Sequence, residues 1–166
     1  MNLTKYLKRL IFIICILSWL VFIFGMSAKT GEESAGLSLR ITRQIYKVNL
    51  VRQIIKLDTL HTIIRKCAHF TEYGILAILV LELADTFDKW KKILLQKRYV
   101  KCLWWIVIFC IIVAASDEFH QSFVPDRGPS IRDVCIDTGG SLMFLVIAVI
   151  IKICRLHRLK IGRAHV

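Results

Sequence analysis

The sequence predicts an all-α polytopic membrane protein: a bundle of four transmembrane helices with an interfacial amphipathic helix beside it. Of the 166 residues 56% are hydrophobic, against about 45–50% in soluble domains, and the mean hydropathy is +0.59. The apolar residues are concentrated in four long runs. Only helices and closed barrels satisfy their backbone groups in lipid, and a barrel would need many alternating segments. The runs are therefore expected to be helices.

The four runs have the length of membrane-spanning helices. They are Leu10–Met26, Cys67–Ala84, Cys102–Ser116 (extended to about 101–118) and Val134–Ile151. A spanning helix needs about 20 residues, with a usual range of about 17–25. The first run follows Lys5, Lys8 and Arg9, so it could instead be a cleaved signal peptide. Its length and the poor cleavage site at Met26–Ala28 favour an uncleaved helix.

These runs make up one predicted domain, residues 1–160. Residues 161–166 read as the translation of a widely used sequencing adapter, and we expect them to be an artefact foreign to the natural chain. The six cysteines are scattered, mostly inside apolar runs, with no CxxC spacing. We therefore expect buried free thiols rather than disulfides.

The distribution of basic residues predicts the orientation. With the N-terminus inside, most of the 24 Lys and Arg residues fall in the N-terminal tail, the loop 85–101 and the C-terminal tail. This bias favours a multi-pass membrane protein with those segments in the cytoplasm. The net charge of +12 is then explained mainly by membrane anchoring. No fold motif or basic–aromatic surface supports nucleic-acid binding, so we expect no nucleic-acid partner.

The segment 27–66 is expected to carry a helix of its own. Thr30–Glu33 matches a capping box, which is a typical helix start. Five apolar residues then fall on one helical stripe: Ile41, Ile45, Val48, Val51 and Ile55. Such a helix could lie on the outer leaflet with its apolar face in the lipid. A solvated loop helix fits the same pattern, and the sequence leaves both interpretations open.

Polar residues at one depth of three runs are the main functional signal. On the expected topology they lie near the outer leaflet: Arg65, His69, Glu72 and Tyr73 on the second run, Asp117, Glu118 and Gln121 on the third, Asp133 and Asp137 on the fourth. Charges inside spans are costly, face the bundle interior and are usually functional. We therefore predict a polar pocket with an anion-sized centre. Gly139 and Gly140 would let another helix approach closely.

A structural interpretation competes with the functional one. Arg65 could pair with Glu72, and Arg132 with Asp133, merely to hold the bundle together. Because two helices would suffice for pairing and three contribute charges, a pocket fits the pattern better. Glu82 lies near the other end of its run, off the shared face, and we expect its side chain to reach the interface.

Two motifs resemble those of the VanZ-like family of small bacterial membrane proteins. They are Arg65–Tyr73 and Ser116–Arg127, the latter followed by Arg132–Gly140, and Met26–Ser34 resembles the segment after the first helix of many members. The resemblance covers roughly Leu10 to Ile151. It implies that the site includes His69, Glu72, Tyr73, Asp117, Glu118, Gln121, Arg127 and Asp133. Asp126 departs from the family pattern, which usually has Gly there, and its added charge beside Arg127 weakens the case for Arg127 as an anion contact.

The resemblance also implies a cell-envelope function linked to resistance to the glycopeptide antibiotic teicoplanin. Two hypotheses follow, and the sequence does not decide whether the protein is an enzyme. In the first, an intramembrane enzyme processes a lipid headgroup with the catalytic residues His69, Glu72, Asp117, Glu118 and Asp133. Its substrate is a membrane lipid or lipid-linked envelope precursor, bound by Arg65, Tyr73, Gln121, Arg127 and Asp137.

In the second hypothesis the protein is non-enzymatic, and the same charges recognise a partner or hold the bundle together. The carboxylates permit a divalent cation, because hard cations prefer several carboxylate oxygens. The spacings resemble no closed metal site, so we assign no metal ligands and expect no cofactor. The sequence gives no indication of the oligomeric state.

Overall fold

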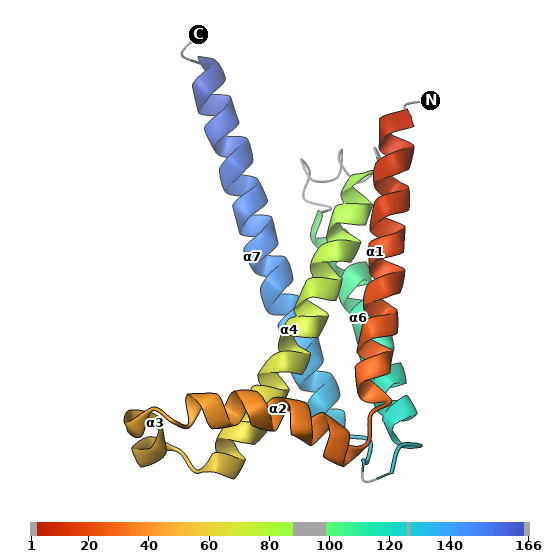
Figure 1. Cartoon of the computed structure of the whole chain (residues 1–166). Coiled ribbons are helices and arrows are strands. Elements are labelled where there is room, and N and C mark those ends of the chain that lie inside the picture. The colour runs from red at the N-terminus through yellow and green to blue at the C-terminus, as the bar shows by residue number, and fades with distance from the viewer. Residues whose placement is uncertain (1–2, 88–98, 126, 165–166) are drawn as a thin grey trace.

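The computed structural model describes residues 3–87, 99–125 and 127–164, which form helices joined by short connections (Figure 1). The described helices are α1 (Leu3–Ser27), α2 (Gly31–Ile45), α3 (Asn49–Ile54), α4 (Leu57–Asp85), α6 (Tyr99–Gln121) and α7 (Ile131–Ala164). Four of them, α1, α4, α6 and α7, are long and apolar enough to cross a membrane. The all-α, four-span fold predicted from the sequence is confirmed, and the chain is a multi-pass membrane protein.

The spanning helices are longer than the apolar runs that predicted them. The helix α4 begins at Leu57 rather than near Cys67, and α7 continues from Ile131 to Ala164. Polar residues do not end a helix where it leaves the hydrocarbon, because its backbone hydrogen bonds stay internal. The basic residues expected in the cytoplasmic loop at 89, 91, 92, 97 and 98 lie outside the described residues.

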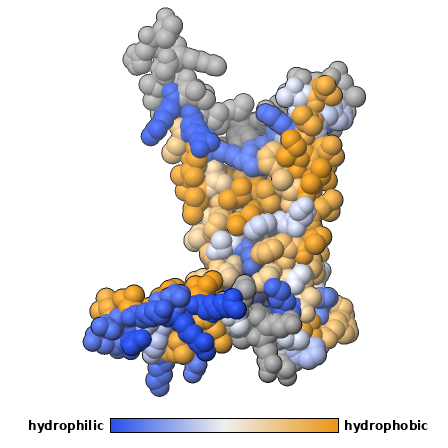
Figure 2. Space-filling view, viewed as in Figure 1, coloured by the Kyte–Doolittle hydropathy of each residue, from blue (hydrophilic) through white to orange (hydrophobic). Residues whose placement is uncertain are grey.

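The amphipathic segment forms two helices instead of one, and the expected continuous stripe is therefore interrupted. Val48 and Ile55 have extended backbones (φ −73°, ψ 118° and φ −132°, ψ 138°), so both lie outside α3. Arg52 Nε donates a hydrogen bond to the Tyr46 carbonyl at 2.7 Å and helps to fix the break. We call residues 31–54 the α2–α3 arm. Figure 2 shows orange along its upper edge, toward the apolar bundle, and blue over much of the rest.

The helix α4 is central: it packs against α1, α2, α6 and α7. In Figure 1, α7 crosses α4 and then diverges from it toward the C-terminus. At the crossing, a Cβ added to Gly140 would lie 2.0 Å from the Phe70 carbonyl oxygen. The close approach expected at this glycine pair therefore occurs at Gly140, whereas at Gly139 the nearest atom would be 3.6 Å away.

Two expectations about side chains can be compared with the structure. Glu82, expected to reach the interface, forms an ion pair with Lys152 of α7 at 2.8 Å, and Lys152 also pairs with Asp85. The cysteines whose side chains the structure describes are free, but of these only Cys110 is buried, and the others are exposed: Cys15, Cys67, Cys135 and Cys154. Their positions on the outward faces of apolar helices suit thiols that contact lipid rather than a protein core.

Candidate functional site

The polar residues singled out in the sequence gather at one end of the bundle. There α1 and α6 end, and α7 begins, while the first half of α4 passes beside them (Figure 1). We call this region, which contains Ser27, Arg65, Asp117 and Asp133, the polar end. Because consecutive spans run in opposite directions, residues far apart in the chain meet here. Two cavities lie in this region, and residues of α4 line both of them.

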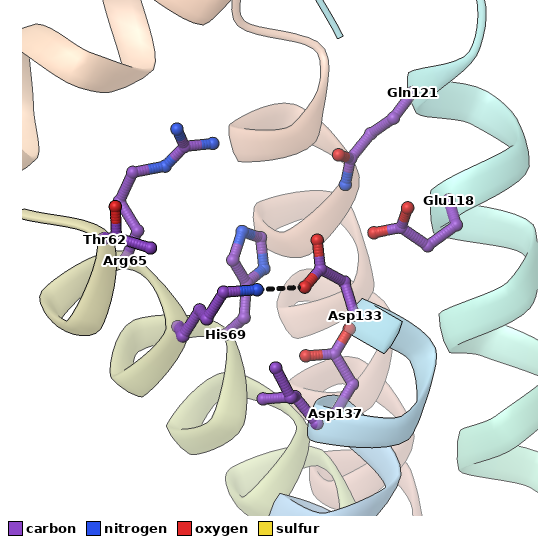
Figure 3. Close-up of a pocket in the computed structure, with 9 residues that line it drawn as sticks. Thr62, Arg65, His69, Glu118, Gln121, Asp133 and Asp137 are labelled. Carbon is purple, nitrogen blue, oxygen red and sulfur yellow. Dashed lines mark hydrogen bonds and ion pairs between the residues drawn. The ribbon is translucent and has the colours of Figure 1, made fainter. Parts of the chain in front are cut away.

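The larger cavity, of about 230 Å³, lies between α4, α6 and α7 (Figure 3). Its lining residues are Thr62, Arg65, Lys66, His69, Glu118, Gln121, Asp133, Ile136 and Asp137. In Figure 3, Glu118 and Gln121 extend from α6 toward Asp133 of α7. Six of the predicted site residues therefore surround one cavity, and they come from three helices.

Hydrogen bonds hold the carboxylates of the larger cavity in place. Glu118 Oε2 accepts a hydrogen bond from the Ser130 backbone N–H at 2.7 Å, and Ser130 Oγ accepts one from the Asp133 N–H at 3.3 Å. Asp133 also forms an ion pair with Lys66 of α4. The expected partner, Arg132, is exposed and forms no ion pair within the described residues, because side chains one position apart on a helix do not face each other.

Asp137 is the most enclosed carboxylate of the larger cavity. Its side chain comes from the first half of α7, and the residue is only 2% exposed. Its Oδ1 atom is buried and has no hydrogen-bond partner among the described residues. A buried carboxylate oxygen without a donor is costly. Because Asp137 also lines the larger cavity, a ligand there would lie beside this carboxylate.

The smaller cavity, of about 100 Å³, lies between α1, α2 and α4. It is lined by Met26, Ser38, Ile41, Ile64, Arg65, Ala68, His69, Glu72 and Arg127. Arg65 and His69 line both cavities, so the two spaces adjoin at these side chains. Ser38 also interacts with His61 of α4 at 2.6 Å, which fixes the α2–α3 arm beside this cavity.

Two guanidinium groups line the smaller cavity. Arg127 Nη1 donates to the Ser27 carbonyl at 3.3 Å, while its Nε is buried without a partner among the described residues. Burial lowers the pKa of Arg127 from its ordinary value, the nearby positive charge of Arg65 lowers it further, and the negative charges of Asp117 and Glu118 act in the opposite direction. Arg65 has neither a hydrogen bond nor an ion pair within the described part of the chain. The two cations therefore repel each other across a small space.

The expected pair between Arg65 and Glu72 does not form. These residues are seven positions apart, which separates them by about 10 Å along a helix axis. Glu72 Oε2 lies instead 3.5 Å from His69 Nδ1. His69 thus has a carboxylate beside one ring nitrogen without a hydrogen bond to it, because Glu72 Oε2 is buried without a hydrogen-bond partner among the described residues. Within the residues that the structure describes, no three His, Cys, Asp or Glu side chains are arranged to hold a metal ion.

Two predicted site residues lie outside the linings of the two cavities. Asp117 is fully buried and accepts hydrogen bonds at Oδ2 from Ser27 Oγ at 2.7 Å and Gln121 Nε2 at 3.0 Å. Tyr73 is also fully buried, and its hydroxyl has no partner among the described residues. Neither residue lines a cavity. Asp126, whose charge was expected to affect Arg127, lies outside the described residues.

Sequence reasoning missed the residues that organise this end. Gln121 Nε2 donates to Ser27 Oγ at 2.9 Å, so Ser27 ties the end of α1 to α6. Ser130 directly precedes α7 and orients Glu118, and Lys66 neutralises Asp133. Ser130 could have been found as a helix N-cap before an acidic first turn. Ser27 and Lys66 gave no such signal, since their roles depend on which helices are neighbours.

A protein-family model described as VanZ/LLP1 matches residues 12–152, which is most of the chain. The matched region runs from α1 into α7 and includes both cavities and both sequence motifs. No curated protein matches the chain, and no solved structure matches it.

Proposed function

The chain belongs to the VanZ/LLP1 family, and from this premise we propose that its polar end binds the anionic headgroup of an envelope lipid or of a lipid-linked precursor. The observation that carries the proposal is the pair of arginines in the smaller cavity. Arg65 and Arg127 both line it, and neither has an ion-pair partner within the described residues. An anion between them would relieve their repulsion.

The chemistry of the two side chains suits a phosphate or carboxylate. A guanidinium is planar and can hold either group with two parallel hydrogen bonds. The buried Nε of Arg127 would gain the acceptor that it lacks. A cavity of about 100 Å³ has the volume of only a few water molecules, at about 30 Å³ each, so it suits a small anionic group.

The walls of the smaller cavity favour an amphiphile over a soluble anion. Met26, Ile41, Ile64 and Ala68 supply apolar surface next to the arginines. The cavity also lies at the end of four helices that are long and apolar enough to span a membrane. A lipid phosphate lies at such a depth, with its acyl chains alongside the helices.

The proposal is tested by lipid binding to the purified full chain in neutral detergent. The probe is dihexanoyl-phosphatidylglycerol, a short-chain anionic lipid. We expect saturable binding that Arg65→Gln or Arg127→Gln weakens by about tenfold or more, since each removes charge-assisted hydrogen bonds. The control, Arg155→Gln, changes an exposed arginine of α7 that lines neither cavity and should bind normally. Equal affinity in all four proteins would refute the proposal.

We further propose that the polar end faces the outside of the bacterial cytoplasmic membrane, with the N-terminus inside. Single cysteines at Gly128 and Arg155, in a chain without its own cysteines, test this with an impermeant thiol reagent on intact cells. Labelling at Gly128 alone supports the orientation, and labelling at Arg155 alone reverses it. Outward-facing lipid binding would also connect the site to teicoplanin susceptibility. Expression in a sensitive strain should then raise resistance, and Arg127→Gln should abolish the effect.

Catalysis is a second candidate function, favoured by the geometry of His69. Its ring lies 3.5 Å from Glu72, and it lines both cavities, so it is within reach of ligands in either. As general base or acid it would act on a lipid bound at Arg65. His69→Gln should then abolish product formation from a bound lipid while binding persists. If the variant retains full function in cells, the protein acts without turnover.

A further inference from the structure

The two adjoining cavities have opposite electrostatic character. The smaller contains the guanidinium groups of Arg65 and Arg127 with one carboxylate, Glu72. The larger contains three carboxylates, those of Glu118, Asp133 and Asp137, against two cations, Arg65 and Lys66, and Lys66 is already paired with Asp133. A second anion would be repelled by the larger cavity. Its lining instead suits a positively charged group that donates hydrogen bonds.

Asp137 is a carboxylate that lacks such a donor. The residue is 2% exposed, lines the larger cavity, and has a buried Oδ1 without a partner among the described residues. Glu118 extends from α6 on the opposite wall of the cavity, and its carboxylate accepts a hydrogen bond from the Ser130 N–H at 2.7 Å. Burying a carboxylate without a donor or a counter-charge is unfavourable. A cation in the cavity would supply a counter-charge beside the carboxylates of Asp137 and Glu118.

Arg65 and His69 lie where the two cavities meet, which suggests one ligand that extends over both. In Figure 3 the Arg65 guanidinium lies well away from the carboxylate of Asp137, so positive and negative groups are separated across the site. A ligand that matches this order has a phosphate and an amine a few bonds apart.

We propose that the ligand headgroup is zwitterionic, of the phosphoethanolamine type: its phosphate lies between Arg65 and Arg127, and its primary ammonium group lies in the larger cavity, where it donates to Asp137 and Glu118. This inference rests on the proposed function, because it keeps the anion at the two arginines. An ammonium fits better than a neutral hydroxyl, since a hydroxyl would leave the excess negative charge of the larger cavity uncompensated.

The test compares three dihexanoyl lipids with the purified full chain in neutral detergent. They are phosphatidylethanolamine, the same lipid with its amine acetylated, and phosphatidylglycerol. We expect phosphatidylethanolamine to bind about tenfold more tightly than the other two, as one charge-assisted hydrogen bond would give. Asp137→Asn should remove this preference, and saturable phosphatidylglycerol binding by the variant would show that it is folded. The control Asp58→Asn, at an exposed position of α4, should keep the preference.

The outcomes separate this inference from the proposed function. If the three lipids bind equally and Arg127→Gln weakens all of them, the zwitterion is overturned while anionic headgroup binding stands. If Arg127→Gln affects none of them, both fail. If free phosphoethanolamine binds as tightly as the lipid, the claim that the ligand is a lipid is overturned. A preference that magnesium ions abolish would assign the carboxylates to a metal cation and overturn the ammonium.

Discussion

Replacing Gly140 by alanine is predicted to force α4 and α7 apart, whereas the same change at the adjacent Gly139 is not. At Gly140 the new Cβ would lie 2.0 Å from the Phe70 carbonyl oxygen and 2.8 Å from its carbonyl carbon. These are backbone atoms of α4, which cannot rotate away as a side chain can. Ordinary contact lies near 3.5 Å, so the crossing must open by roughly 1.5 Å.

The expected cost follows from comparing the two positions. Overpacking a well-packed contact costs about 1–3 kcal/mol. Both substitutions gain the same helix preference of alanine over glycine, about 0.5–1 kcal/mol. At Gly139 the nearest atom to an added Cβ, Phe70 Cε2, is 3.6 Å away, which is ordinary contact. Gly140→Ala should therefore be less stable than Gly139→Ala by about 1–3 kcal/mol.

The assay is denaturant unfolding of the full chain in detergent, followed by fluorescence of its four tryptophans. Because Asp137 lies one turn before Gly140 and His69 precedes Phe70, opening the crossing should also weaken lipid binding at the larger cavity. Equal stability of Gly140→Ala and Gly139→Ala would refute the close α4–α7 contact and the placement of the cavities that depends on it.

Three further predictions concern single contacts. Ser27→Ala removes the buried donor to Asp117 and the acceptor for Gln121, and should lower the free energy of unfolding by about 1–3 kcal/mol, while Ser116→Ala at an exposed position should have little effect. Lys152→Met leaves Glu82 and Asp85 without their partner and should lower the free energy of unfolding by about 1–2 kcal/mol in the same assay. This is less than the roughly 3–5 kcal/mol expected for a fully buried pair, because the Glu82 side chain is 38% exposed. Arg127→Lys keeps the charge but loses the planar fork, so phosphatidylglycerol affinity should fall between those of the wild type and Arg127→Gln; affinity equal to that of the wild type would argue against bidentate binding.

The number and type of the spanning helices could be predicted from the sequence, since lipid requires long uninterrupted apolar helices. The residues at which these helices begin and end could not be predicted from the sequence. The ten residues from Leu57 to Lys66 of α4 are too polar to register as a span, yet they carry Thr62, Arg65 and Lys66 into the larger cavity. The break between α2 and α3 was also missed, because the apolar stripe is compatible with a continuous helix and the contact of Arg52 with Tyr46 cannot be inferred from spacing.

For the candidate site, helical spacing correctly grouped residues of the same helix but could not assign partners between helices. Arg65 and His69 share a face, as predicted, and line both cavities. The partner of Asp133 proved to be Lys66, 67 positions away, and that of Asp117 to be Ser27, 90 positions away. Such contacts depend on which helices are neighbours, and one sequence does not contain that information. The division of the polar end into two cavities of opposite charge also depends on which helices are neighbours, so it could not be predicted from the sequence.

The central claim, that a lipid anion lies between two arginines, is tested most directly by solid-state NMR. Distances would be measured between the phosphorus of bound phosphatidylethanolamine and the guanidinium nitrogens of ¹⁵N-arginine-labelled protein in bilayers. We predict contacts at hydrogen-bonding distance from Arg65 and Arg127, one lost in each single variant to glutamine and both lost in the double variant. Phosphorus–nitrogen contacts that persist unchanged in the double variant would contradict the account.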